Sequence, residues 1–161
     1  MRHFQPFHQV SIKSLAHVDA PHRISSAAIE DQLSTTFERL GMRSGILEHV
    51  AGIKARRYWD EGTLPSDAAT LAGHKAIKQS GISADMIGAL VSTSVCRDYL
   101  EPSTACRVHH ALGLPSAALN FDIGNACLGF MNGMDFIAQL IEAGRIDYGI
   151  VVDGEGSREV T

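Results

Sequence analysis

Apolar residues at helical spacing predict two helices in the first half of the chain. The first begins at Ser25 or Ser26, either of which can cap a helix. Its apolar face consists of Ile29, Leu33, Phe37 and Leu40, and Gly41 follows as a stop signal. The second helix opens with Pro65 and runs to a stop at Gly81. Residues 46–61 have no clear period and predict a loop with a short strand.

The second half of the chain alternates between short apolar runs and helical patterns. The runs predict strands over 89–95, 119–123 and 148–153, and the patterns between them predict helices over 102–112 and 126–143. An apolar/polar alternation over 10–18 predicts a further strand near the start. Strands that alternate with helices indicate an α/β fold with βαβ units and a mostly parallel sheet covered on both faces. No linker interrupts residues 1–161, so we expect one domain.

Composition narrows the class of protein. The chain has 161 residues, of which 45% are hydrophobic, and a formal net charge of −4. These values are typical of a globular protein, and the acidic balance disfavours nucleic acid as a partner. No run is long enough to span a membrane, and the N-terminus lacks the apolar core of a signal peptide. Three cysteines without regular spacing fit a reducing compartment, so we expect a cytoplasmic location.

One cysteine stands where a nucleophile is favoured. The strand 119–123 is followed by Gly124, which permits a sharp turn, and by Asn125, a good helix cap. Cys127 then falls in the first turn of the helix 126–143, whose positive end stabilises a thiolate. A small apolar core residue is the alternative interpretation, and spacing alone leaves both open.

The helix 126–143 is apolar almost all round, which predicts that it is buried, and Gly129 and Gly133 would admit another backbone. The other two cysteines, Cys96 and Cys106, have no comparable turn and are interpreted as packing residues. No cysteine or histidine pair has the spacing of a metal site, so we expect no metal.

The segment 122–135, with its Asn125-Ala126-Cys127 turn, resembles the condensing enzymes of the thiolase superfamily, especially β-ketoacyl-ACP synthase III. Four other segments agree in order and spacing: 52–57, 92–94, 101–105 and 147–155. Within the superfamily, residues 97–103 and 132–135 are most similar to the enzymes that join two fatty acyl-CoA chains head to head in long-chain olefin biosynthesis.

The resemblance implies a thiolase fold, in which two βαβαβ-type halves form five layers, and a homodimer. This chain would be the N-terminal half. The implied reaction is a Claisen condensation in fatty acid or related lipid biosynthesis, with no cofactor beyond the coenzyme A thioester substrate. Cys127 would accept an acyl group from acyl-CoA. The acceptor would be a second acyl-CoA or malonyl-ACP, which makes acyl carrier protein a further candidate partner.

The resemblance also implies roles for five other residues. Glu101 is similar to the glutamate that reaches the partner subunit's active site and acts there as a base; the alternative is that it complements the dipole of the helix after Pro102. Lys54, Arg56 and Arg57 would attract the phosphates of coenzyme A. Trp59 would pack on the adenine or, as the alternative, on the protein itself.

The resemblance further implies a histidine and an asparagine from the second half of the fold, and none of the eight histidines here stands at a matching place. We therefore expect residues 1–161 alone to be poorly active, because such donors stabilise the developing oxyanion. Two alternatives remain open: a non-catalytic subunit or truncated fragment that pairs with a full-length or C-terminal homologue, and a small hydrolase that uses Cys127 with a histidine of this chain.

Overall fold

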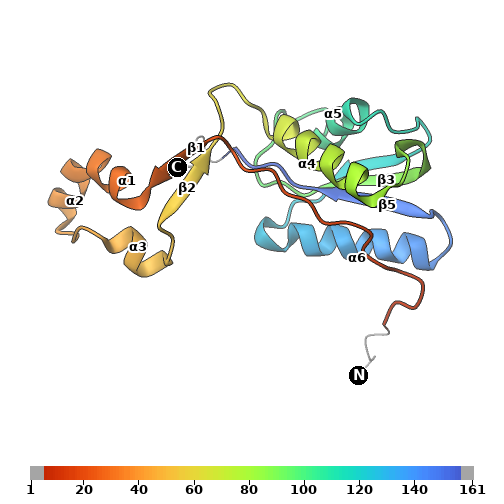
Figure 1. The fold of residues 1–161 in the computed structure, drawn as a ribbon, viewed down its shortest axis with the longest axis horizontal. Coiled ribbons are helices and arrows are strands. Elements are labelled where there is room, and N and C mark those ends of the chain that lie inside the picture. The colour runs from red at the N-terminus through yellow and green to blue at the C-terminus, as the bar shows by residue number, and fades with distance from the viewer. Residues whose placement is uncertain (1–5, 157–161) are drawn as a thin grey trace. The chain divides into compact units, whose positions relative to one another are not determined.

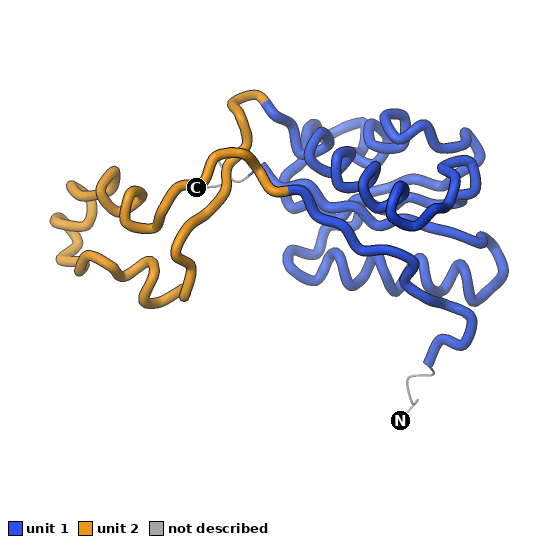
Figure 2. Tube along the Cα trace, in the orientation of Figure 1, with its two compact units in different colours: residues 1–18, 63–161 blue, residues 19–62 orange. Residues whose placement is uncertain are grey.

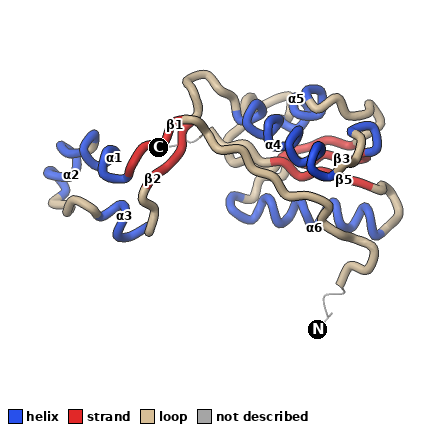
Figure 3. The backbone as a smooth tube through the Cα atoms, in the orientation of Figure 1, coloured by secondary structure: helices blue, strands red, loops and turns tan. Residues whose placement is uncertain are grey.

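The computed structural model describes residues 6–156, which form two compact units (Figure 2). The hairpin unit consists of residues 19–62, and the sheet unit consists of residues 6–18 and 63–156. The two units differ in secondary structure, because the parallel strands belong to the sheet unit and an antiparallel pair belongs to the hairpin unit (Figure 3).

The sheet unit contains three parallel strands. They are β3 (Ile87–Ser92), β4 (Leu119–Asp122) and β5 (Tyr148–Val152), arranged in the order β4-β3-β5. Leu90 pairs with Asn120 on one side and with Ile150 on the other. All three strands therefore end at the same edge of the sheet, which we call the carboxyl edge. The predicted strands are confirmed, although each ends one to three residues earlier than expected.

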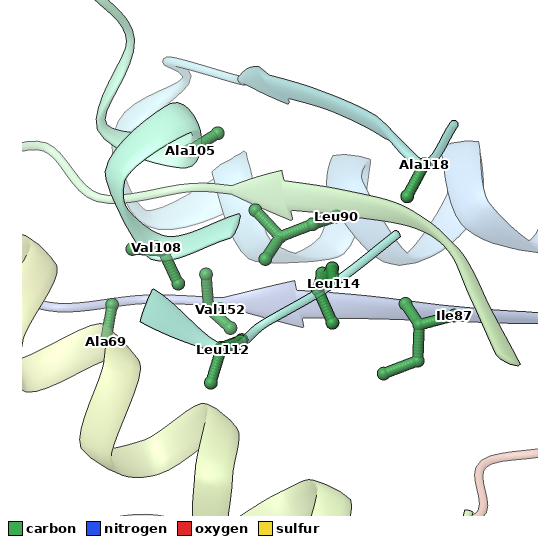
Figure 4. Close-up of a cluster of buried hydrophobic side chains, with 9 residues drawn as sticks. All are labelled: Ala69, Ile87, Leu90, Ala105, Val108, Leu112, Leu114, Ala118 and Val152. Carbon is green, nitrogen blue, oxygen red and sulfur yellow. The ribbon is translucent and has the colours of Figure 1, made fainter. Parts of the chain in front are cut away.

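Helices cover both faces of this sheet (Figure 1). On one face lie α4 (Pro65–Ser80) and α5 (Thr104–Ala111), and on the other lies α6 (Gly129–Glu142). The core beneath α4 and α5 brings together small and branched side chains: Ala69, Ile87, Leu90, Ala105, Val108, Leu112, Leu114, Ala118 and Val152 (Figure 4). On the α6 side, Ile137 packs against Ala89 and Val91. The predicted α/β architecture is confirmed.

Helix α6 is buried along one face rather than all round. Its buried residues are Gly129, Gly133, Ile137 and Ala138, whereas Met131 is 59% exposed. The two glycines do admit a close approach, as expected. A Cβ atom at Gly129 would lie 3.0 Å from the backbone oxygen of Thr93, and one at Gly133 would lie 3.0 Å from side-chain atoms of Thr93 and Val151. The glycines thus let the start of α6 rest directly on the end of β3.

The predicted strand over 10–18 is wrong. This segment is extended but pairs with no strand of the described chain, and Ile12 and Leu15 are 71% and 80% exposed. It is held instead by α4, because the Ser14 hydroxyl donates to the carbonyl of Ala76 and the Lys75 ammonium donates to that of His17. The alternation of apolar and polar residues therefore marks no buried face within the described residues.

The hairpin unit contains an antiparallel pair of strands, β1 (His22–Ser25) and β2 (Ala55–Tyr58). Three short helices connect them: α1 (Ser26–Gln32), α2 (Ser34–Leu40) and α3 (Ile46–Ala51). The single helix expected up to Leu40 is two helices, because the backbone turns at Leu33, just before the poor helix formers Ser34, Thr35 and Thr36. Ser25 caps α1 and Gly41 ends α2 with a φ of 63°, both as predicted.

A buried carboxylate organises the hairpin unit. Glu30 on α1 is 5% exposed and accepts hydrogen bonds from the N–H groups of Leu47 at 2.7 Å and Gly45 at 2.5 Å. These two N–H groups lower the pKa of Glu30, against the opposing effect of burial. Glu30 therefore holds the start of α3 against α1 as a charged group.

Two further observations complete the fold. A 3₁₀ turn, η1 (Ala84–Met86), precedes β3. Among residues 6–156, no helix combines the length and the apolar character that crossing a bilayer requires.

Candidate active site

The candidate nucleophile lies on a strained turn at the carboxyl edge. After β4, the N–H of Ile123 donates to the carbonyl of Ser92, which keeps the chain beside β3 for one more residue. The 3₁₀ turn η2 (Ala126–Leu128) follows and carries Cys127. Ala126 has a φ of 43°, the left-handed region that a residue with a side chain rarely adopts. The turn is therefore made at Ala126, not at Gly124 as the sequence suggested.

Cys127 precedes α6 rather than lying inside it. Leu128 is the N-cap of α6, so Cys127 stands one residue before the N-cap and two before Gly129, where the helix begins. Asn125 makes no side-chain cap bond, contrary to expectation, and instead its amide donates to the side-chain oxygen of Asn132 at 2.7 Å. This bond ties the turn to the first turn of α6. Cys127 is exposed, so within the described structure it is not the buried core residue of the alternative interpretation.

Asp122, the last residue of β4, connects the nucleophile turn with the segment that carries Glu101. Its carboxylate accepts the N–H groups of Thr104 at 3.0 Å and Ala105 at 2.8 Å, and so caps the start of α5. Glu101 is exposed, three residues before α5. Asp122 thus fixes the start of α5 just after the segment that carries Glu101, and Cys127 follows Asp122 by five residues in the chain. Sequence reasoning missed Asp122, although an acidic residue at the end of an apolar strand is a usable signal.

The ends of β3 and β5 form a polar region at the same edge. Ser92, Thr93 and Ser94 are all buried, and the hydroxyl of Ser94 accepts the N–H of Gly154 at 2.8 Å. Burial first, and then the neighbouring Glu155 carboxylate, raise the pKa of Asp153. Because Gly129 rests on Thr93, this polar region lies beneath the start of α6.

The four residues expected to bind coenzyme A all belong to the hairpin unit, on β2 or beside it. Arg56 donates to the Ser26 hydroxyl at 3.0 Å, and Arg57 donates to the carbonyl of Ala20 at 3.0 Å. Lys54 is exposed and Trp59 is half-buried. Because neighbouring residues of a strand point to opposite faces, Arg56 and Arg57 do not form one patch.

The other two cysteines and two of the histidines have identifiable surroundings in the structure. Cys106 is exposed on α5, so its interpretation as a buried packing residue is wrong, whereas Cys96 is half-buried and its N–H donates to Glu155. His22 contacts Asp60 and His109 contacts the carbonyl of Pro115. Within residues 6–156, no group of three or more His, Cys, Asp or Glu side chains could hold a metal ion.

Several curated proteins are similar to this chain. An acyl-CoA:acyl-CoA alkyltransferase of Xanthomonas campestris is 52% identical over 149 residues, which cover 92% of this chain and 44% of that protein. The protein of the same name from Shewanella oneidensis is 42% identical and is also covered to 44%. A β-ketoacyl-ACP synthase III of Koribacter versatilis is 31% identical over 91% of this chain and 42% of its own length. The chain thus spans less than half the length of these relatives, and no family model matches it.

Solved structures agree with this likeness. The crystal structure of cerulenin-bound Xanthomonas campestris OleA matches with a TM-score of 0.90 and 51% identity, over 94% of this chain and 44% of that one. A variant of the same protein in which a cysteine is replaced by alanine matches equally well, with a TM-score of 0.90 and 50% identity over the same shares. The chain therefore belongs to the thiolase-fold condensing enzymes that include the acyl-CoA:acyl-CoA alkyltransferases and β-ketoacyl-ACP synthase III.

Proposed function

We propose that this chain carries the acyl-accepting part of an enzyme that condenses two acyl thioesters in fatty acid or related lipid biosynthesis. The observation that carries the proposal is the exposed Cys127 on its strained turn before α6, in a chain 52% identical to an acyl-CoA:acyl-CoA alkyltransferase. An exposed sulfur at the end of a rigid sheet is open to a thioester carbonyl. Such an attack requires the thiolate form of the cysteine.

In the first step, the Cys127 thiolate attacks the carbonyl carbon of an acyl-CoA. The carbon–sulfur bond to coenzyme A breaks, coenzyme A leaves as a thiolate, and the acyl group remains on Cys127 as a new thioester. In the second step, the α-carbon of the acceptor attacks this thioester and the Cys127 thiolate leaves. With a second acyl-CoA as acceptor, the product is a 2-alkyl-3-oxoacyl-CoA.

We propose Glu101 as the base that removes the α-proton of the second acyl-CoA. Its support is the anchoring by Asp122 of the start of α5, three residues after Glu101, together with the variants of Xanthomonas campestris OleA in which a glutamate or a cysteine is replaced. The same number of positions separates these two altered residues in that protein as separates Glu101 from Cys127 here. Glu101 is exposed in this chain, which fits a role in the site of a second subunit in a homodimer.

The proposal also covers the binding of coenzyme A, the possible role of acyl carrier protein and the location of the protein in the cell. The exposed Lys54 supplies the cation with the best access to coenzyme A phosphates, since Arg56 and Arg57 already have partners within the hairpin unit. The half-buried Trp59 carries an aromatic ring of the kind that packs against adenine. Acyl carrier protein would deliver the acceptor only if that acceptor were malonyl-ACP. The three cysteines have no regular spacing, which favours the reducing cytoplasm.

The experiment that tests the proposal follows the product. The chain is supplied with ¹³C-labelled acyl-CoA, alone and together with a polypeptide that covers the remainder of the Xanthomonas relative, and the thioesters are separated by mass spectrometry. We expect a doubly labelled 2-alkyl-3-oxoacyl-CoA from the combined sample. Release of CO₂ with malonyl-ACP, and no product from acyl-CoA alone, would assign the second type of acceptor. Absence of both products, with no release of coenzyme A in either sample, contradicts the proposed function.

A further inference from the structure

The segment that carries Glu101 needs an anchor. Residues 95–103, which we call the Glu101 loop, connect β3 to α5 without helix or strand. Leu100 and Tyr99 in this loop are 86% and 49% exposed, so apolar packing does little to fix it. A base must nevertheless be held in one place relative to its substrate, because a displacement of 1 Å costs about 100-fold in rate.

Both ends of the loop are fixed through backbone groups. At the start, the Glu155 carboxylate accepts the N–H groups of Val95 at 2.7 Å and Cys96 at 3.2 Å. At the end, Asp122 caps α5 through Thr104 and Ala105. These contacts leave the middle of the loop, residues 98–101, to be held by side chains.

Asp98 holds the middle of the loop from inside the protein. Its side chain has no exposed area, and one oxygen accepts the N–H of Ser66 at the start of α4, at 3.0 Å. The other oxygen has no hydrogen-bond partner in the described structure and lies 3.7 Å from Nε of Arg107. A buried carboxylate is stable only when a cation or donors compensate it, so Asp98 depends on Arg107 and on the start of α4.

Arg107 connects three elements from its position on α5. Besides its ion pair with Asp98, it donates hydrogen bonds to the Tyr99 hydroxyl at 3.2 Å and to the Asp67 carboxylate on α4 at 3.0 Å. Although burial lowers the pKa of Arg107, Asp67, Tyr99 and Asp98 raise it above its ordinary value. The planar guanidinium can serve all three partners at once, which a lysine ammonium on a flexible stem does not reproduce.

We propose that Arg107, acting with the buried Asp98, is a positioning residue that fixes residues 98–101 and thereby presents Glu101 at the carboxyl edge. Arg107 contacts the two loop residues that lie two and three positions before Glu101. The catalytic consequence rests on the proposed function, because it assumes that Glu101 acts as the base. The structural part, an ordered Glu101 loop held by Arg107, does not depend on that assumption.

Hydrogen exchange followed by mass spectrometry tests the structural part in the full chain. In Arg107→Met, we expect amides of residues 98–101 to exchange about 10-fold faster, while peptides from β3 and β5 stay as protected as before. Asp98→Asn should show the same local change. Arg107→Lys should show a smaller change, because lysine keeps the positive charge but lacks the planar guanidinium with its several N–H donors. His110→Ala, at an exposed position on the same helix, is the matched control and should leave the loop unchanged. Equal exchange in wild type and Arg107→Met overturns the proposal.

The two half-reactions test the catalytic part in the combined sample described above. Acyl transfer to Cys127 should keep its rate in Arg107→Met, whereas the exchange of the acceptor α-proton with D₂O and the formation of product should fall about 10- to 100-fold. Arg107→Lys should restore part of that loss. If acyl transfer falls in parallel with proton exchange, Arg107 supports the fold in general and the proposal is wrong. If wild-type Cys127 accepts no acyl group, the proposed function fails, and the hydrogen exchange alone decides on Arg107.

Discussion

In the sheet unit Leu90, Val91 and Val108 have no exposed area, whereas the buried side chains of the hairpin unit are only Ala20, Ser26 and Glu30. The sheet unit is thus stabilised by an apolar core on both faces of a parallel sheet. The hairpin unit is stabilised by hydrogen bonds to Glu30 and Ser26. The candidate nucleophile and base belong to the apolar-cored unit, and the candidate coenzyme A contacts belong to the polar one.

This difference suggests a division of properties. The residues proposed to act in bond formation belong to the unit with the apolar core, and the residues proposed to contact coenzyme A belong to a unit with few buried apolar side chains. The four predictions below test whether the two units respond to substitution as this division requires.

The largest effect is expected from Gly154, after β5. A Cβ atom there would collide with the backbone of Pro65 and Ala69 at the start of α4. Gly154→Ala should therefore lower the free energy of unfolding of the sheet unit by more than about 3 kcal/mol. Gly156→Ala is the control, because its Cβ would lie 3.6 Å from the nearest atom, an ordinary contact. Similar denaturant unfolding curves for the two variants would contradict this account of the packing.

Truncation of apolar side chains should separate the two units next. Leu90→Ala, in the core of the sheet unit, should lower the free energy of unfolding by about 3 kcal/mol. Leu40→Ala, at a position 60% exposed on α2, should lower it by less than about 1 kcal/mol. Denaturant titration of both variants measures the contrast, and an equal loss would show that the hairpin unit also has an apolar core.

The hairpin unit should instead respond to the charge of Glu30. Because its pKa is lowered in the folded state from an ordinary value near 4.5, ionised Glu30 stabilises the fold above that pH. The stabilisation should disappear as the pH falls through the lowered pKa. Glu30→Gln should therefore increase amide exchange at Gly45 and Leu47 at neutral pH, with a shrinking difference from wild type in acid. Glu38→Gln, at an exposed position on α2, is the control and should show no such change.

The smallest effect is expected at Asp153, where the dependence of stability on pH has the opposite sign to that at Glu30. Its pKa is raised in the folded state, so protonation stabilises the sheet unit, and that stabilisation is complete below an ordinary pKa of 3.8 and is lost as the pH rises through the raised pKa. Asp153→Asn should give a small increase in melting temperature at pH 7 and none in acid. A decrease at pH 7 would mean that the hydrogen bonds of Asp153 with Thr93 and Ser94 outweigh its burial.

The same contrast explains what the sequence could predict. From Pro65 onward the elements of the sheet unit have strong apolar patterns, and the strands and helices expected there were confirmed, including α4 from Pro65 to its stop at Gly81. In the hairpin unit the break at Leu33 and the helix α3 were missed, because Glu30 stabilises α3 through backbone N–H groups that leave no apolar pattern. The extended segment 10–18 was misread because it is held by two side-chain bonds rather than by a buried face.

The candidate site shows a similar limit. The pattern from strand to turn to helix located Cys127, and the turn residue was misplaced because the left-handed backbone falls on Ala126, a residue type that gives no such signal. The roles of Asp122, Asp98 and Arg107 depend on contacts between residues far apart in the sequence. Such contacts are visible only once the strand order has brought the carboxyl ends together.

The central claim is that Cys127 accepts the acyl group, and peptide mapping after incubation with acyl-CoA tests it most directly. Mass spectrometry should find one acyl adduct on the peptide that contains Cys127, in the chain alone or in the combined sample. The adduct should persist in Cys106→Ala, which removes the other exposed cysteine, and disappear in Cys127→Ala. An adduct that maps to Cys106, or an unmodified Cys127 in both samples, would contradict the account.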